Sequence, residues 1–342
     1  MVINKQFSAL RNKQVLITGG CGFIGSEITK QLSKAGAKIT ILDNLSSGKE
    51  QYVKGLPNVA LLKGDLANTD LVQKAVKNKE YIIHLAALPF IPDSYYYPME
   101  FFEVNVNSTI NLALAAIREK KVKRFVHISS SEIYGSSRLT PMDENHPTTP
   151  HSTYAVSKLA GERVIYTMHK EHDLPAVIIR PFNSFGTNIT QPYVIPEIIG
   201  QLLKGNKELT LGNIHSKRDL TFVSDTARGI ILSLITDGII GETINIGSER
   251  AVAVRDLVKM ISELLSVDVT IKIDPTRFRP YDVDSLVCDY GRASRLLGWK
   301  PEVSIRDGLK LTIDWMKNNK VELKAPFKGW AASYRKDRNG LL

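Results

Sequence analysis

The stretch VLITGGCGFIG, residues 15–25, indicates the fold of this chain. It places Gly19, Gly22 and Gly25 directly after an apolar run and at the start of an amphipathic one. Glycines let the backbone turn tightly, and the free N–H groups at the start of a helix favour an anion such as a pyrophosphate. Three spaced glycines alone are a weak signal. Their position between a predicted strand and a predicted helix predicts a dinucleotide-binding unit.

Short apolar runs alternate with amphipathic stretches along the first half of the chain. The runs are apolar throughout, which is typical of strands buried on both faces and of a parallel sheet covered by helices. Gly36 is placed to close the first helix. The alternation predicts an α/β, doubly wound fold of the Rossmann type. The predicted strands are residues 13–18, 38–42, 58–64, 80–86, 124–130 and 175–181, and the predicted helices are residues 22–37, 108–122 and 152–172.

The pattern loosens after residue 181, where proline and glycine interrupt it. Residues 218–235 and 242–247 are predicted to return to the sheet, and the rest is mostly helical with short strands. We therefore expect a smaller, mostly helical C-terminal lobe that binds the substrate. The predicted division is residues 1–181 plus about 219–248 for the dinucleotide domain, and about 182–218 plus 249–342 for the lobe.

Composition narrows the function classes. The chain has 342 residues and a formal charge of +10, which favours anionic partners such as nucleotides or sugar phosphates but also fits good solubility alone. The basic, aromatic stretch 327–340 is a weak signal for nucleic acid, and we expect neither nucleic-acid binding nor membrane insertion.

Cys21 and Cys288 lie far apart without metal-ligand spacing, which favours a reducing, cytoplasmic location. His169 and His172 share a helix face without a third ligand, so no metal site is predicted.

Two aspartates point to the cofactor. Asp43 ends the second predicted strand, where a carboxylate accepts hydrogen bonds from a ribose diol and repels a 2′-phosphate. The neighbours of Asp43 are Leu42 and Asn44 rather than a cation, so NAD is favoured over NADP. Asp65 follows the third strand and is placed either to contact the adenine amine or to serve a turn or helix cap.

Tyr154 and Lys158 stand four residues apart on a predicted helix and therefore share a face. A lysine ammonium and an oxidised nicotinamide nearby would lower the pKa of the phenol toward neutrality, so that the phenolate takes a proton from a sugar hydroxyl. Tyr166 and Lys170 repeat the spacing, but only one pair can lie at the nicotinamide. The serines at 129–131 end a strand at the ligand-binding edge of the sheet and favour Tyr154.

The chain resembles the extended short-chain dehydrogenase/reductase family, and within it the NAD-dependent nucleotide-sugar epimerases and dehydratases. The resemblance rests on TGGCGFIG (18–25), LDNLSSG (42–48), GDL (64–66), HLAA (84–87), SSSEIYG (129–135), YAVSK (154–158), RPFNSFG (180–186), RDLTFVSD (218–225) and RP (279–280). It implies a tightly held NAD that is oxidised and reduced again within each turnover. It also implies a homodimer formed through two central helices, here about 101–118 and 153–172.

The resemblance also implies residue roles. Ser130 corresponds to the hydroxyl residue that binds the reacting sugar oxygen, Tyr154 to the base and Lys158 to the residue that binds the nicotinamide ribose. The residues expected to bind or support NAD are Gly19, Gly22, Phe23, Ile24, Gly25, Asp43, Asn44, Asp65, Leu66, Leu85, Ala86, Ala87, Asn105, Tyr154 and Lys158. The residues expected at the nucleotide-diphosphate sugar are Asn183, Arg218 and Arg279 for the diphosphate, Val194 for the nucleobase and Ser94 for the sugar. The tyrosines at 95–97 are equally suited to covering the lobe interface.

Glu132 bears on the choice of reaction. All of these enzymes first oxidise sugar C4, and a 4-epimerase then needs no further base. A 4,6-dehydratase must also remove the C5 proton, and members of that group carry a hydroxyl residue, a variable residue and a glutamate that acts as the base. Ser130, Ser131 and Glu132 resemble that triplet, although some dehydratases have an aspartate where Ser131 stands.

The leading prediction is therefore a nucleotide-sugar 4,6-dehydratase, acting on a UDP-linked hexose or N-acetylhexosamine. A nucleotide-sugar 4-epimerase and a UDP-uronate decarboxylase, which also carries Ser-Glu, stay open. A binding protein that only senses NAD is the alternative from another class. Such proteins tend to lose the tyrosine–lysine pair, and this chain retains Ser130, Tyr154 and Lys158 together.

Overall fold

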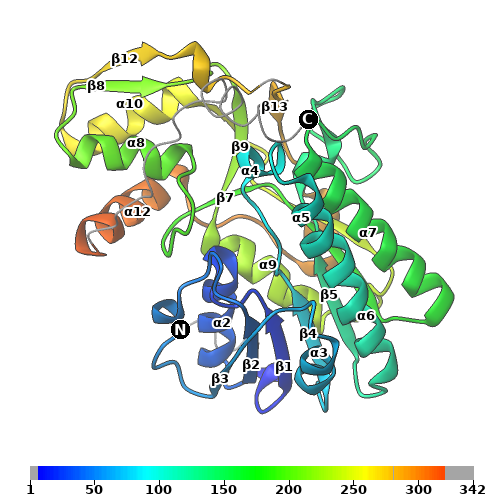
Figure 1. Ribbon diagram of the computed structural model, residues 1–342. Coiled ribbons are helices and arrows are strands. Elements are labelled where there is room, and N and C mark those ends of the chain that lie inside the picture. Colours follow the sequence, from blue (N-terminus) through cyan, green and yellow to red (C-terminus); the bar gives the residue numbers. More distant parts are fainter. Residues whose placement is uncertain (1–6, 280, 320–342) are drawn as a thin grey trace.

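The computed structural model describes residues 7–279 and 281–319. Its centre is a seven-stranded parallel sheet in the order β10-β6-β5-β4-β1-β2-β3 (Figure 1). Six of these strands coincide with the predicted apolar runs, which confirms the doubly wound fold. The strands are β1 (Gln14–Thr18), β2 (Lys38–Asp43), β3 (Val59–Lys63), β4 (Tyr81–His84), β5 (Arg124–Ile128), β6 (Ala176–Pro181) and β10 (Thr243–Ile246).

Helices cover both faces of this sheet. Successive side chains on a strand point to opposite faces, so Val15 and Ile17 pack on one side and Leu16 on the other. One face carries α2 (Phe23–Lys34) and α9 (Val223–Ile235), with α11 (Gly291–Leu297) beside them. The other face carries α3 (Thr69–Val76), α6 (Ser108–Arg118) and α7 (Thr153–His172), and α6 is preceded by α4 (Ile91–Ser94), α5 (Pro98–Phe102) and a π-helical turn (Glu103–Asn107).

The order of the strands reverses between β1 and β4. The chain builds outward from β1 to β3, then returns to place β4 on the other side of β1. Ligands of doubly wound proteins bind in the crevice at the carboxyl ends of the strands at such a switch point. Backbone hydrogen bonds hold the two loops that leave this edge, from Gly19 N–H to Leu42 O (3.0 Å) and from Leu85 N–H to Thr18 O (3.1 Å).

The second lobe lies across the carboxyl edge of the sheet (Figure 1). Its core joins Ile198 and Ile199 to Leu257, Ile261 and Leu309. Its helices are α8 (Val194–Leu203), α10 (Val254–Leu265) and α12 (Ile305–Asn319). A four-stranded sheet contains β7 (Asn183–Phe185), β9 (Lys217–Phe222), β11 (Ala251–Ala253) and β13 (Ser285–Leu286), and a two-stranded sheet contains β8 (Glu208–Leu211) and β12 (Thr270–Ile273).

One expectation about this half of the chain needs correction. β9 does not return to the main sheet, because it pairs with β7, β11 and β13 and its Phe222 packs on Phe185 within the lobe. The lobe combines the helices α8, α10 and α12 with short strands. β10 does join the main sheet beside β6, as predicted. The division into two domains stays a prediction, and the basic stretch 327–340 and Pro280 lie outside the described residues.

Across residues 7–279 and 281–319, we find no helix with both the length and the apolar character needed to span a bilayer.

Candidate active site

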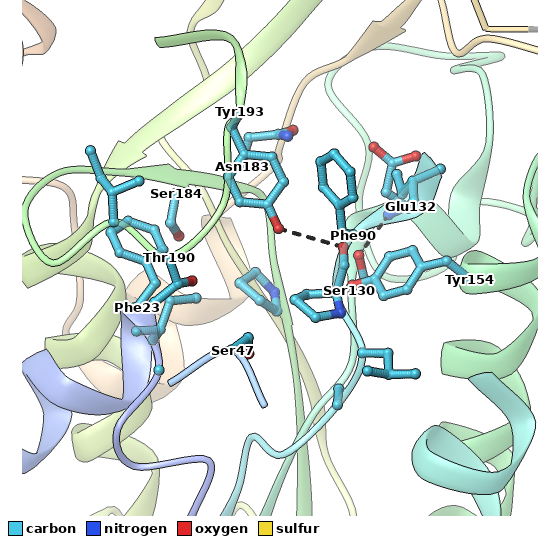
Figure 2. Close-up of a pocket in the computed structure, with 18 of the residues that line it drawn as sticks. Phe23, Ser47, Phe90, Ser130, Glu132, Tyr154, Asn183, Ser184, Thr190 and Tyr193 are labelled. Atoms are coloured by element: carbon cyan, nitrogen blue, oxygen red, sulfur yellow. Dashed lines mark hydrogen bonds between the residues drawn. The ribbon is translucent and has the colours of Figure 1, made fainter. Parts of the chain in front are cut away.

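A cavity of about 670 Å³ opens between the carboxyl edge of the main sheet and the second lobe. Figure 2 shows side chains from both parts pointing into it, with Ser130, Glu132 and Tyr154 on one side and Phe23, Ser47 and Thr190 away from them. Most residues predicted from the sequence line this single cavity. They are Gly19, Gly22, Phe23, Ile24, Gly25, Asp43, Asn44, Asp65, Leu66, Leu85, Ala86, Ala87, Ser130, Ser131, Glu132, Tyr154, Lys158, Asn183, Val194, Arg218 and Arg279.

Gly19, Gly22 and Gly25 form a tightly packed loop, which we call the glycine cradle, and the cradle leaves little room for side chains. A Cβ on Gly25 would lie 2.1 Å from the Gly19 carbonyl oxygen, and a Cβ on Gly19 would lie 2.8 Å from the Ala86 nitrogen. Gly19 also has φ +71°, which glycine adopts without steric cost. Close packing of this loop on the start of α2 leaves the N-terminal N–H groups of that helix facing the cavity, where a pyrophosphate fits.

Asp43 and Asp65 are tied into the loops that follow their strands. Asp43 accepts hydrogen bonds from the backbone N–H of Cys21 (2.9 Å) and of Leu45 (2.8 Å), so its carboxylate is fixed at the rim of the cavity. Asp65 accepts from the Asn44 amide (2.7 Å) and from the Ala67 N–H (2.8 Å). The turn role that the sequence left open for Asp65 is therefore present, and it holds Asn44 in place at the same time.

A hydrogen-bonded chain positions the loop after β4. His84 bridges the hydroxyls of Thr18 (2.7 Å) and Thr109 (2.8 Å), and the Thr18 hydroxyl accepts from the Ala86 N–H (3.3 Å). Asn105 does not line the cavity. Its amide oxygen accepts from the Leu88 N–H (2.8 Å) and its amide nitrogen donates to the Ser157 hydroxyl (2.9 Å), so it connects the loop after β4 to α7.

Tyr154 and Lys158 line the cavity from α7. Burial raises the pKa of Tyr154 to about 12, and a hydrogen bond with Ser130 opposes that shift while the charge of Glu132 adds to it. Burial lowers the pKa of Lys158 to about 8, and its ammonium donates to the Ile128 carbonyl (2.5 Å). The described residues alone thus do not lower the pKa of the phenol, and the lowering expected from the sequence requires a further positive charge in the cavity.

The second tyrosine–lysine pair lies elsewhere. The Arg163 guanidinium stacks 4.2 Å from the centre of the Tyr166 ring, and the Lys170 ammonium lies 5.6 Å from it. Neither Tyr166 nor Lys170 is among the residues that line the cavity. Of the two pairs, Tyr154 and Lys158 are therefore the one that lines the cavity.

The turn after β5 presents Glu132. Ser130 begins this turn and accepts a hydrogen bond from the Glu132 N–H (3.2 Å), which fixes the glutamate beside Tyr154 (Figure 2). Glu132 is 8% exposed, and among the described residues its carboxylate has no hydrogen bond or ion pair. A buried carboxylate without a protein partner is costly, so its occurrence at a cavity wall points to use by a ligand.

Two guanidiniums meet a single carboxylate at the lobe side of the cavity. Asp282 Oδ1 lies 3.3 Å from Arg218 Nη2 and 3.6 Å from Arg279 Nη1. Burial lowers the pKa of Arg218, whereas Arg279 keeps 30% of its side chain exposed. Nearby, the amide oxygen of Asn183 is buried without a described partner. Two cations facing one carboxylate leave a net positive charge that suits a diphosphate.

Ser94, like Asn105, is a predicted site residue that the structure places outside the cavity. It is fully buried, and its hydroxyl donates to the Ile91 carbonyl within the same short helix (2.7 Å). The following tyrosines are also absent from the described lining, which instead includes Phe90, Ile91 and Pro92 from this segment. The assignment of Ser94 to the sugar is therefore corrected, because the turn of α4 directs its hydroxyl inward.

Sequence reasoning missed several residues of the site. Asp282 was detectable, since an acid three residues beyond Arg279 can pair with it. Phe90, Thr190 and Tyr193 come from loops, and no periodicity in the sequence indicates which way their side chains point. Ser129 lines the cavity too, with its hydroxyl buried and unpartnered among the described residues.

Within the described residues no group of three histidine, cysteine or acidic side chains is arranged as a metal site.

Comparisons with known proteins agree with this arrangement. The family model described as GDP-mannose 4,6 dehydratase matches residues 16–312. A putative UDP-glucose 4-epimerase of Methanocaldococcus jannaschii is 31% identical, and the alignment covers 89% of this chain and 99% of the relative. A dTDP-glucose 4,6-dehydratase of Streptomyces niveus is 30% identical over 92% of this chain and 96% of the relative. The crystal structure of a dTDP-glucose 4,6-dehydratase from Streptomyces venezuelae with NAD and TYD bound superimposes with a TM-score of 0.82, at 31% identity over 90% of this chain and 98% of that one.

Proposed function

The chain belongs to the extended short-chain dehydrogenase/reductase family of nucleotide-sugar dehydratases, epimerases and decarboxylases, and on this premise we propose that it is a nucleotide-sugar 4,6-dehydratase. We propose a UDP-linked hexose or N-acetylhexosamine as its substrate. The single observation that carries the proposal is the buried carboxylate of Glu132, which lines the cavity beside Tyr154 and has no described protein partner.

The enzyme is NAD-dependent, as its family is. The residues that would hold the dinucleotide are those of the glycine cradle, Asp43 at the rim and the Tyr154–Lys158 pair, all of which line the cavity. When bound, NAD supplies a hydride acceptor for sugar C4 and returns the hydride at the end of the turnover. No net oxidant is consumed.

Tyr154 and Ser130 act on the C4 hydroxyl. Tyr154 takes the hydroxyl proton as the C4–H bond breaks, and Ser130 holds the same sugar oxygen. The pKa of Tyr154 is raised to about 12 by burial, so the phenolate needs a nearby cation, which Lys158 and an oxidised nicotinamide would provide together. The product of this step is a 4-keto sugar, whose C5 proton is acidic because it lies beside the ketone.

Glu132 then removes the C5 proton, and the C6 hydroxyl leaves as water. Ser131 is a hydroxyl rather than a carboxylic acid, so we assign the return of a proton to the departing oxygen to Glu132 as well. The carboxylate lies within electrostatic range of the Arg218 guanidinium, where its charge opposes the lowering of the Arg218 pKa by burial. Hydride return to C6 and proton return to C5 complete the 4-keto-6-deoxy product.

A 4-epimerase is the second candidate function. The observation that favours it is the relative from Methanocaldococcus jannaschii, a putative UDP-glucose 4-epimerase that matches at least as well as the dehydratases do. An epimerase turns the keto sugar over and returns the hydride to C4, so it would need Tyr154 and Ser130 but not Glu132.

Product mass and stereochemistry separate these functions. We would incubate the purified protein with UDP-glucose, UDP-N-acetylglucosamine, UDP-glucuronate, GDP-mannose and dTDP-glucose and analyse the products by mass spectrometry and NMR. The proposal predicts loss of one water and a 4-keto sugar. Loss of carbon dioxide from the uronate would indicate a decarboxylase, and a C4 epimer of unchanged mass would indicate an epimerase. Either result would overturn the dehydratase proposal.

Glu132→Gln tests the residue itself. The amide keeps the shape of the side chain but cannot take the C5 proton, so we expect dehydration to fall by at least about 100-fold. Oxidation at C4, followed by NADH absorbance in a single turnover, should persist. The matched control is Glu171→Gln at the exposed end of α7, which should leave turnover unchanged. Normal dehydration by Glu132→Gln would remove Glu132 from the mechanism.

We also propose that the enzyme is a homodimer through α5, α6 and α7. Met99 (80% exposed), Phe102, Leu114 and Val156 are large apolar side chains that remain exposed on these helices. Exposed apolar groups gathered on one face commonly mark a protein interface. Light scattering should report a dimer, and Val156→Lys should shift it toward the monomer. A monomeric wild-type protein would contradict this proposal.

The cytoplasmic location remains a proposal that rests on the cysteines. Cys21 and Cys288 are both buried and unpaired, which suits a reducing compartment.

A further inference from the structure

The segment between β7 and α8, residues 186–193, crosses from one wall of the cavity to the other. Five of its residues line the cavity, namely Gly186, Ile189, Thr190, Pro192 and Tyr193. We call this segment the strap. It belongs to the second lobe by sequence, yet Figure 2 shows Thr190 close to Phe23 of the glycine loop and on the same side of the cavity as Ser47. The side chains of the strap thus face the part of the cavity that would hold the dinucleotide.

The strap is joined to the first turn of α2. The Asn188 amide donates to the Ser26 hydroxyl at 3.1 Å, and the Ser26 hydroxyl in turn donates to the Phe23 carbonyl at 3.0 Å. Asn188 has φ +61°, a conformation that asparagine and glycine adopt more readily than other residues. This contact joins the strap to the first turn of the helix whose N-terminal end lines the cavity.

A second contact joins the strap to the loop that follows Asp43. The Tyr52 hydroxyl donates to the Ile189 carbonyl at 2.9 Å. The ring of Tyr52 packs edge-on against Trp315 of α12, with the ring centres 6.1 Å apart, and this contact positions the Tyr52 side chain. Burial raises the pKa of Tyr52 to about 12, so its hydroxyl stays a donor at physiological pH. Ser46, Ser47 and Gly48, just before it, line the cavity on the ribose side.

A third, weaker contact lies at the other end of the strap. The Tyr193 hydroxyl lies 3.5 Å from the Pro89 carbonyl, and the rings of Tyr193 and Phe90 are 6.1 Å apart. The strap is therefore connected in succession to the glycine-loop helix, to the loop after β2 and to the loop after β4. These are the three segments that would surround a dinucleotide along its length.

We propose that the strap is a retaining latch for NAD, with Tyr52 and Asn188 as positioning residues that keep it closed between turnovers. This inference rests on the proposed function, since it concerns the cofactor of that reaction. A dinucleotide beneath the strap cannot leave until the contacts to Ser26 and Ile189 open. Retention of the cofactor matters to an enzyme that returns the hydride to the same sugar, because loss of the reduced cofactor would leave the keto-sugar intermediate without its hydride donor.

The test measures NAD release from the intact enzyme rather than turnover. Wild type, Tyr52→Phe, Asn188→Gly and the double variant are loaded with NAD, freed of excess by gel filtration, and mixed with a second dehydrogenase that converts released NAD to NADH. Each neutral hydrogen bond is worth about fivefold in an equilibrium, so we expect each single variant to release NAD roughly 3- to 10-fold faster. We expect the double variant to release NAD more than tenfold faster.

Matched controls distinguish a latch from a general loss of stability. Tyr81→Phe removes a tyrosine hydroxyl at the opposite edge of the sheet, and Asn58→Gly replaces an exposed asparagine at φ +59°. Both should release NAD at the wild-type rate. Release from the double variant at the wild-type rate, or equal acceleration by the controls, would overturn the latch. A wild type that cannot be loaded with NAD at all would instead refute the proposed function.

Discussion

Glu162 lies one helical turn beyond Lys158 and accepts two hydrogen bonds from the Arg180 guanidinium, at 3.0 Å from Nε and 2.5 Å from Nη2. Both side chains are buried, at 8% exposure for Arg180 and 1% for Glu162. Arg180 also donates to the Tyr134 hydroxyl at 2.8 Å, and Tyr134 ends the turn that carries Glu132. One buried ion pair therefore supports both the helix of Lys158 and the turn of the proposed C5 base.

Glu162→Gln should move the alkaline limb of the pH profile. Burial lowers the pKa of Lys158 to about 8, and the negative charge of Glu162 opposes that shift. His84 and His127 also face this lysine, and both are neutral near pH 7 because burial lowers their pKa values. Without the carboxylate the pKa of Lys158 falls further, so the ammonium is lost at lower pH. We expect the alkaline limb of kcat to shift to lower pH.

The control for this variant is Glu171→Gln, an exposed carboxylate near the end of the same helix. It should keep the wild-type profile. If Glu162→Gln lowered kcat equally at every pH, the ion pair would support the fold without influencing Lys158. Thermal unfolding measured in parallel would report the stability lost with the ion pair.

Gly25→Ala should abolish NAD binding, and Gly22→Ala should weaken it less. A Cβ at Gly25 would lie 2.1 Å from the Gly19 carbonyl oxygen, whereas a Cβ at Gly22 would lie 3.2 Å from the same atom. The first contact forces the backbone of the cradle to move, and overpacking of this kind costs about 1–3 kcal/mol. The measurement is NAD content after purification together with the unfolding free energy. Equal effects of the two variants would contradict the close-packing argument.

Much of this site was predictable because parallel strands bring their carboxyl ends to one edge. Gly19, Asp43, Leu85 and Ser130 each follow a buried apolar run, and the structure gathers them around one cavity. Periodicity also identified α2, α6 and α7 and the strands between them. These features depend on local patterns that the sequence carries directly.

The remaining features depend on pairings between distant segments. β9 precedes an apolar helix, α9, as a strand of the main sheet would, and nothing in its sequence shows that it pairs with β7 and β11 rather than with the main sheet. Ser94 follows a loop, and only the turn of α4 shows that its hydroxyl points to Ile91. The strap contacts Asn188–Ser26 and Tyr52–Ile189 join residues more than 130 positions apart, which no local pattern encodes.

Arg279→Gln should weaken nucleotide-sugar binding with little change in kcat. The Arg279 guanidinium is partly exposed at the cavity and shares Asp282 with the buried Arg218. A charge-assisted hydrogen bond to a phosphate is worth about 1.5–3 kcal/mol, so we expect KM to rise about 10- to 100-fold. Arg306→Gln, which removes an exposed arginine paired with Glu263 on α10, is the control. An unchanged KM in Arg279→Gln would exclude this residue from the diphosphate site.

His127→Leu should make the protein less sensitive to acid. His127 is 1% exposed, neither ring nitrogen has a partner among the described residues, and burial lowers its pKa well below 6.5, with the charges of Lys158 and His84 adding to the effect. As pH falls below about 6.5 the unfolded chain binds a proton that the folded chain does not, so stability falls by up to about 1.4 kcal/mol per pH unit for each such histidine. Leucine removes this proton uptake and also two unpaired polar atoms. Urea unfolding at pH 7, 6 and 5 should show a shallower loss of stability for His127→Leu than for wild type, with the exposed His172→Leu as control. A wild-type slope in His127→Leu would mean that His127 is already protonated in the folded protein.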